Sequence, residues 1–492
     1  MGEEISSKSF SRQQRTRYRE RLQHNLDDFA KFLTTESFVD EGTIGLEMEI
    51  NLVDEGFQPS LRNAQVLDNI ADESFQTELG AFNIELNYPV LSINGDGLAQ
   101  LEQGLKDRLD AAAAKAADAE SALLLVGTLP TLTRELLQSE DWMSPGKRYE
   151  ALNESVLQAR GEDVELDIHG DEDLSVFMGS VAPEAACTSV QFHLQVSPRR
   201  FPGAWNASQI IAGPQLALAA NSPLFLGKRL WHETRVELIK QAIDTRAPEM
   251  QNQGVRPRVW FGERWITSIF DLLEENVRYF PALLPELRED QDTPEFTESG
   301  APVAHELRLH NGTVYRWNRP IYDPGTDKPH LRVENRVLPA GPTLIDTVAN
   351  AAFYFGLVES LQREDRPLWS RMSFSSAEEN FIACARDGLG AQVYWPGVGN
   401  VPVDELIVKL LLPMAAKGLR ALNVDEDLVT KYLGILHDRA TSNQNGAQWQ
   451  LDCLERLEAN GMDRKDALTE LTRLYAGHSR SNQPVHTWPL PG

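Results

Sequence analysis

The chain has 492 residues, of which 41% are hydrophobic and 24% charged. This is a globular composition, so it excludes a disordered or fibrous chain, and at about 100–200 residues per domain it predicts two to four structural units. The 47 basic and 73 acidic residues give a net charge of −26. Such a charge disfavours binding to nucleic acid or to an anionic membrane surface.

The sequence also excludes several cellular destinations. No apolar run approaches the roughly 18 residues of a membrane span, and the N-terminus lacks the apolar segment of a secretory signal. The three cysteines are scattered without a CxxC pair, which disfavours a disulfide framework and a zinc site. We therefore expect a cytoplasmic protein.

Helices and well-separated strands alternate along the chain, as judged from apolar periodicity. Helices are predicted at 1–36 and 97–120, across 206–280, and at 343–363, 376–387, 403–421, 426–439, 446–459 and 464–476. Strands are predicted at 43–53, 81–93, 123–130, 188–196 and 330–338. The order is typical of an α+β fold with one antiparallel sheet, because no regular βαβ array is present.

Two further segments carry local signals. Asn311-Gly312 lies between two alternating runs in 306–317 and predicts a hairpin. Residues 286–303 are acidic and rich in turn formers, which predicts a mobile surface loop. The predicted organisation is an N-terminal helix over 1–40, a catalytic sheet with inserted helices over 41–340, a helical region over 341–476 and a flexible tail over 477–492.

Four of the predicted strands carry a polar face that is unusually acidic. Side chains alternate across a strand, so residues two apart share a face. These faces could simply meet water, as in any one-sided antiparallel sheet. Their content is selective, however, with several glutamates, one histidine and hardly any lysine or threonine. The residues on the polar faces are Glu47 and Glu49; Glu85 and Asn87; Gln191, His193 and Gln195; and Arg332, Glu334 and Arg336.

A crowded acidic face on one sheet predicts divalent cations. Like charges close together are costly unless cations neutralise them, and oxygen ligands with an occasional histidine suit Mg²⁺ or Mn²⁺. Arg332 and Arg336, which flank Glu334, can bind phosphate or carboxylate groups. The chain has no Walker A motif and no GxGxxG after a strand, so any ATP would be held through metals and arginines.

The order of these segments resembles the bacterial glutamate–cysteine ligase type 2 family, within the glutamine synthetase-like superfamily. The resemblance covers about residues 40–450. The segments that carry it are GLEMEINLVD (45–54), NIELN (83–87), VGTLP (126–130) with SPGKRY (144–149), SVQFHLQ (189–195), LALAANSPLFLG (216–227) with Arg235 beyond it, and RVENR (332–336).

The resemblance implies a curved antiparallel sheet that forms a funnel, with flanking helices and a helical C-terminal third. It also implies an enzyme that uses ATP and two or three Mg²⁺ ions, or Mn²⁺, to join glutamate to cysteine through γ-glutamyl phosphate. The implied metal ligands are Glu47, Glu49, Glu78, Glu85, His193 and Glu334. The implied phosphate and substrate contacts are Arg336 and Arg235, with Arg332, Arg316 and Arg319 as further contacts to ATP or another anion.

Several alternatives stay open from the sequence. Glu78 could be an ordinary solvated residue, and Arg316 and Arg319 could be surface or ion-pair arginines. Gln191 and Leu129 replace histidines of the family pattern, and Asn335 replaces an apolar residue, so the acceptor could be an amine other than cysteine. A phosphotransferase like the guanidino kinases, or a nucleotide-binding protein without turnover, are the remaining hypotheses.

Overall fold

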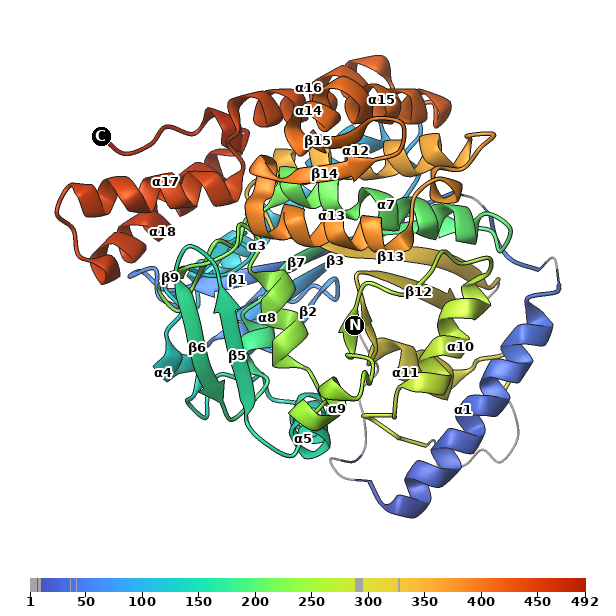
Figure 1. Ribbon diagram of the computed structural model, residues 1–492. Helices are drawn as coiled ribbons and strands as arrows, with labels where there is room; N and C mark the ends of the chain where they lie inside the picture. Colours follow the sequence, from blue (N-terminus) through green and yellow to red (C-terminus); the bar gives the residue numbers. More distant parts are fainter. Residues whose placement is uncertain (1–6, 8–9, 36, 41, 288–294, 326–327) are drawn as a thin grey trace.

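A seven-stranded antiparallel sheet organises the computed structural model, which describes residues 7, 10–35, 37–40, 42–287, 295–325 and 328–492 (Figure 1). The strand order is β12-β13-β7-β1-β3-β2, with β4 also paired to β1. Neighbours in this sheet come from distant parts of the chain. The strands are β1 (Ile44–Val53), β2 (Phe75–Thr77), β3 (Asn83–Leu91), β4 (Ala122–Leu124), β7 (Ser189–Val196), β12 (Asn318–Asp323) and β13 (His330–Pro339).

The apolar face of the sheet packs against two long helices, α7 (Phe201–Ala219) and α12 (Leu344–Gln362) (Figure 1). Phe192 of β7 lies 6.0 Å from Tyr354 and 5.9 Å from Phe355 between ring centroids. By length and composition α12 could cross a membrane, but 94% of its most apolar window is buried inside the protein. A helix that is apolar on all sides and enclosed in this way is a core helix.

Further helices form a second layer behind α7 and α12. Arg439 of α16 donates to Asp346 of α12 at 2.6 Å and to Asn350 at 2.7 Å, so a buried ion pair joins the two layers. The layer and its continuation to the C-terminus contain α13 (Phe374–Asp387), α14 (Val403–Leu406), the π-helical turn η3 (Ile407–Leu411), α15 (Leu412–Ala421), α16 (Glu426–Ser442), α17 (Gly446–Ala459) and α18 (Arg464–Ser481).

Helices on the opposite side of the sheet enclose its polar face. Tyr18 of α1 donates to the carbonyl of Glu306 in α11 at 2.8 Å, which ties the N-terminal helix to this group. Its members are α1 (Arg12–Phe32), α5 (Lys147–Arg160), α6 (Ala182–Ala185), α10 (Ile269–Tyr279) and α11 (His305–Gly312). The other helices are α2 (Asn63–Ile70), α3 (Gly97–Ala117), α4 (Arg134–Leu137), α8 (Arg235–Ala242) and α9 (Pro248–Asn252).

Four two-stranded units complete the described fold, and none was predicted as such from the sequence. The hairpin of β5 (Val164–His169) and β6 (Asp173–Met178) is the longest of them (Figure 1). The others are β8 (Leu224–Phe225) with β9 (Lys228–Arg229), β10 (Val259–Trp260) with β11 (Tyr315–Arg316), and β14 (Gln392–Trp395) with β15 (Gly399–Pro402). The last pair lies between the helices predicted at 376–387 and 403–421, within the region that was predicted to be mainly helical.

The hairpin predicted at Asn311-Gly312 is wrong. The segment is helix α11, which ends at Gly312. Asn311 donates to the carbonyl of Pro320 at 2.8 Å and accepts from Asn276 at 2.9 Å, so tertiary contacts fix it in the helix. The Asn311-Gly312 pair therefore lies at the end of a helix and not in a hairpin turn.

The last residues also differ from the predicted flexible tail. Helix α18 continues to Ser481, and Trp488 is 3% exposed, with its ring 5.3 Å from that of Trp449. The strand predicted at 123–130 is limited to Ala122–Leu124. The predicted N-terminal helix is shorter, and residues 288–294 of the acidic loop predicted at 286–303 lie outside the described residues.

Candidate active site

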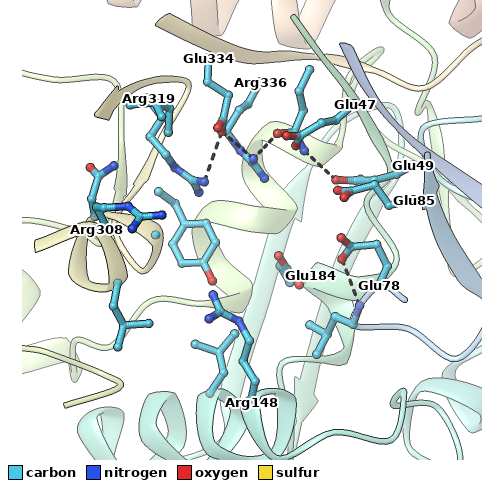
Figure 2. Close-up of a pocket in the computed structure, with 18 of the residues that line it drawn as sticks. Glu47, Glu49, Glu78, Glu85, Arg148, Glu184, Arg308, Arg319, Glu334 and Arg336 are labelled. Carbon is cyan, nitrogen blue, oxygen red and sulfur yellow. Dashed lines mark hydrogen bonds and ion pairs between the residues drawn. The ribbon is translucent and has the colours of Figure 1, made fainter. Parts of the chain in front are cut away.

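Four strands bring acidic and basic side chains to the polar face of the sheet. In the register of the strands, Glu49 lies opposite Glu85 and Glu334 lies opposite His193. Side chains two residues apart share this face, so distant segments converge on one cavity of about 290 Å³ (Figure 2). The predicted site residues that line it are Glu47, Glu49, Glu78, Glu85, Arg319, Arg332, Glu334 and Arg336.

Glu49, Glu78 and Glu85 form a compact group of carboxylates, with one oxygen of each within 4.8 Å of the others. Burial and the neighbouring carboxylates raise the pKa of Glu85 to about 7 and that of Glu78 well above its usual value. Crowded carboxylates are costly unless a cation neutralises them, and Mg²⁺ and Mn²⁺ prefer oxygen ligands. The donor set therefore fits a divalent metal.

Glu49 is held in place by strand β7. Its two oxygens accept from the Ser189 backbone N–H at 2.6 Å, the Ser189 hydroxyl at 3.0 Å and the Gln191 side chain at 3.1 Å. The Gln191 oxygen in turn accepts a hydrogen bond from Arg336. One neutral amide thus joins a carboxylate of the compact group to a guanidinium, because a side-chain amide offers both a donor and an acceptor without a charge.

Glu334 lies between two guanidinium groups. Arg336 donates to it at 2.8 Å, and Arg319 forms an ion pair with it at 3.3 Å (Figure 2). Burial raises the pKa of Glu334, but Arg319 and Arg336 outweigh this and lower it to about 2. This half of the cavity therefore contains an ionised carboxylate between two guanidinium groups. The other half contains Glu78 and Glu85, whose pKa values are raised.

His193 lies beside the cavity but is not among the residues that line it. Its Nε2 is 3.1 Å from Glu47, and its Nδ1 accepts from Arg332 at 3.2 Å. Burial raises the pKa of Glu47, but His193 outweighs this and lowers it. The structure places the histidine behind Glu47, whereas the resemblance implied a direct metal ligand.

Two of the predicted arginines lie outside the cavity. Arg235 is 1% exposed and donates to Glu233 at 2.5 Å and to the carbonyl of Val337 at 3.0 Å. This carbonyl belongs to an irregularity in β13 between Asn335 and Leu338, directly after Arg336. Arg235 thus supports the strand that carries Arg336, in contrast with the predicted substrate contact.

Arg316 is also a structural residue. It donates to Glu275 and to the side chain of Asn276, both at 3.0 Å, and its guanidinium lies 5.1 Å from the ring of Trp260. Its side chain is 2% exposed. The predicted anion contact at this position therefore does not match the geometry, because the guanidinium faces the helix α10.

Three residues depart from the family pattern: Leu129, Asn335 and Gln191. Leu129 is fully buried in the core, and Asn335 accepts from Gln215 and donates to Asn318, each at 2.7 Å. Neither lines the cavity, whereas Gln191 does. Of the three substitutions, only Gln191 therefore lies at the cavity.

The cavity also contains residues that sequence reasoning missed. Glu184 enters from α6, Arg148 from α5 and Arg308 from α11 (Figure 2). Burial and then Glu49 raise the pKa of Glu184 to about 7. Arg148 stands in the SPGKRY segment that carried the family resemblance, so it could have been proposed. Glu184 gave no such signal, because it lies in no predicted strand. Arg308 lies in the segment 306–317, which was wrongly predicted to be a hairpin.

The fold and the cavity define a class of enzyme. A curled antiparallel sheet with a carboxylate-rich and arginine-rich face is the framework of ATP-dependent carboxylate–amine ligases, which use a divalent metal. The model of glutamate–cysteine ligase family 2 (GCS2) matches residues 43–473. The chain therefore belongs to glutamate–cysteine ligase family 2.

Solved structures support the fold at low sequence identity. Glutamate–cysteine ligase from Francisella tularensis, in complex with AMP, matches with a TM-score of 0.54 and 13% identity over 90% of each chain. A bifunctional glutathione synthetase from Pasteurella multocida matches with a TM-score of 0.50 and 12% identity, over 95% of this chain and 55% of that one. A search of curated proteins finds no match.

Proposed function

We propose that this protein is a glutamate–cysteine ligase, which forms γ-glutamylcysteine through a γ-glutamyl phosphate intermediate. The observation that carries the proposal is the compact carboxylate group of Glu49, Glu78 and Glu85 beside the Glu334–Arg336 ion pair in one cavity. A site that combines metal ligands with guanidinium groups is suited to phosphoryl transfer.

Five glutamates of the cavity would hold two or three Mg²⁺ ions, or Mn²⁺ in their place. They are Glu47, Glu49, Glu78, Glu85 and Glu334. When bound, the metal supplies positive charge to the phosphates of ATP. His193 has a different role in this proposal: it contacts Glu47 and fixes its orientation.

The reaction has two steps. The γ-carboxylate of glutamate attacks the γ-phosphorus of ATP, the bond to the ADP oxygen breaks, and γ-glutamyl phosphate forms. The amine of cysteine then attacks the acyl carbon, phosphate leaves with the bonding electrons, and the amine loses one proton. Arg336 donates hydrogen bonds to the phosphoryl oxygens, with Arg319 beside it, and the protein needs no covalent nucleophile.

Gln191 supports a second candidate, a ligase that joins glutamate to another amine. It is the one departure from the family pattern that lines the cavity, so it is the one that can alter the choice of acceptor. A phosphate-release assay with ATP, Mg²⁺ and glutamate over a panel of amines, with mass detection of the product, separates the two. Cysteine as the best acceptor supports the proposal, and a different best amine supports the second candidate.

The same assay tests the other hypotheses. A phosphorylated product without a joined amine would indicate a phosphotransferase, and ATP binding without phosphate release would indicate a binding protein. Glu334→Gln should lower ATP turnover strongly, whereas Glu364→Gln, in an ion pair with Arg371 away from the cavity, should not. Turnover of Glu334→Gln near the wild-type rate would overturn the assignment of Glu334.

A further inference from the structure

Glu184 differs from the other glutamates of the cavity in its hydrogen bonds. Among the residues that the structure describes, none donates a hydrogen bond to its carboxylate. By contrast, Glu49 accepts from Ser189 and Gln191, and Glu334 accepts from Arg336. A carboxylate held in a cavity without a donor is unfavourable, so the position calls for a cation from a ligand.

Glu184 lies outside the compact carboxylate group. The carboxylates that come within 4.8 Å of one another are those of Glu49, Glu78 and Glu85, and Glu184 is not among them. In Figure 2, Glu184 lies between Glu78 and the guanidinium of Arg148. Glu47 and Glu334 also lie outside this group, but each has a partner in the protein: His193 for Glu47, and Arg319 and Arg336 for Glu334. No side chain in the described part of the chain pairs with Glu184, and an organic ammonium group would supply the missing cation.

The charges around Glu184 match those of an amino acid. Arg148 and Arg308 line the same cavity, so it contains guanidinium groups as well as the Glu184 carboxylate. An α-amino acid carries an ammonium group and a carboxylate group a few ångströms apart. Charge-assisted hydrogen bonds of this kind are among the strongest that proteins make to small ligands.

We propose that Glu184 binds the ammonium group of an amino-acid substrate. The inference rests on the proposed function, which supplies two such substrates. One source is the α-ammonium of the donor glutamate, which takes no part in the reaction. The other is the ammonium of the acceptor, which must lose protons before its nitrogen attacks. In either case Glu184 contributes to the choice of substrate and contacts no transferring phosphate.

The test compares ligands with and without the ammonium group. Binding of glutamate, cysteine and glutarate is measured by calorimetry in wild type and in Glu184→Gln. Glutarate keeps both carboxylates of glutamate and lacks the ammonium. Loss of one charge-assisted contact should weaken amino-acid binding by about 10- to 100-fold. Glutarate binding should change less than about threefold, so in the variant the affinity for glutamate falls toward that for glutarate.

The two sources give different results. If glutamate loses affinity, Glu184 binds the donor, and if only cysteine loses affinity, it binds the acceptor. Unchanged binding of both amino acids would overturn the proposal. An increase of tenfold or more in the Mg²⁺ concentration for half-maximal activity, with unchanged amino-acid binding, would assign Glu184 to the metal instead.

Controls separate this result from misfolding and from failure of the proposed function. Glu154→Gln removes an exposed carboxylate on α5 and should bind all three ligands as the wild type does. Glu184→Asp keeps the charge on a shorter side chain and should retain more affinity than Glu184→Gln. Binding needs no turnover, so an enzyme that binds glutamate but fails to join it to cysteine refutes the proposed function alone.

Discussion

Two regions of the protein bury charged side chains in different ways: the helical layer behind the sheet and the cavity in front of it. Behind the sheet, Arg439 and Asp346 are both essentially unexposed and pair at 2.6 Å. In front, the carboxylates of Glu49, Glu78 and Glu85 crowd together without a cation among their side chains.

The two arrangements have different roles: the buried pair belongs to the fold, and the crowded carboxylates form a binding site. In a buried pair such as Arg439 and Asp346 the two charges neutralise each other. Such a pair contributes to a specific fold, and neither charge is available to a ligand. Burial and the neighbouring carboxylates raise the pKa values of Glu78 and Glu85, which costs stability until a cation binds. Four substitutions or conditions test this comparison, from the largest expected effect to the smallest.

Arg336→Ala should have the largest effect, on catalysis. The guanidinium pairs with Glu334 in the cavity and would stabilise charge on the transferring phosphoryl group. We expect kcat/KM to fall about 10³-fold or more, which corresponds to about 4 kcal/mol. Phosphate release with ATP, glutamate and cysteine measures it. Arg371→Ala, at an exposed ion pair, is the control, and a loss below about threefold in Arg336→Ala would contradict the role.

Arg439→Met should act on stability instead. It leaves Asp346 buried without its cation, and breaking a buried pair in this way costs about 3–5 kcal/mol. Urea denaturation measures the loss, while kcat per folded molecule should stay within about twofold. Adding Asp346→Asn to the same variant removes the unpaired charge and should recover part of the stability. A cost below about 1 kcal/mol would show that the pair is not what joins the two layers.

The third prediction concerns pH and metal. The pKa values of Glu85 and Glu184 are raised to about 7, so between roughly pH 4.5 and 7 the folded protein binds more protons than the unfolded chain. The metal-free protein should therefore lose stability as pH rises through this window, by an amount on the order of 3 kcal/mol for each group.

Chemical denaturation at several pH values, after treatment with a chelator, measures this slope. Glu85→Gln should remove the contribution of Glu85 to the slope, because an amide does not titrate, and leave that of Glu184. Saturating Mg²⁺ should flatten the slope, since the cation stabilises the ionised carboxylates. A metal-free protein whose stability rises over the same pH range would contradict the crowding of the carboxylates.

Gln191→Met should have the smallest effect of the four. The variant keeps the volume of the side chain but loses the hydrogen bonds to Glu49 and from Arg336. We expect kcat to fall about tenfold, or about 1–2 kcal/mol, with a smaller change in the KM for ATP. Gln191→His, assayed at pH 8, retains a donor and an acceptor and should recover most of the rate. Equal activity of the two variants would show that the bridge has no influence.

The amino-acid sequence by itself determined which residues share a face. Strand alternation is local, so the pairing of Glu47 with Glu49 and of Glu334 with Arg336 could be predicted from spacing alone. The resemblance added Glu78, which strand alternation could not supply. These residues do line one cavity.

The tertiary structure decided which faces meet and which charges remain available. The register places Glu49 opposite Glu85, a pairing between segments 36 residues apart that no local pattern specifies. In the folded chain Arg235 pairs with Glu233 and Arg316 pairs with Glu275. Both guanidinium groups are therefore held inside the fold. Glu184 reaches the cavity because a short helix precedes β7. Charge and alternation are properties of the chain, whereas a side chain's partners depend on packing between distant segments.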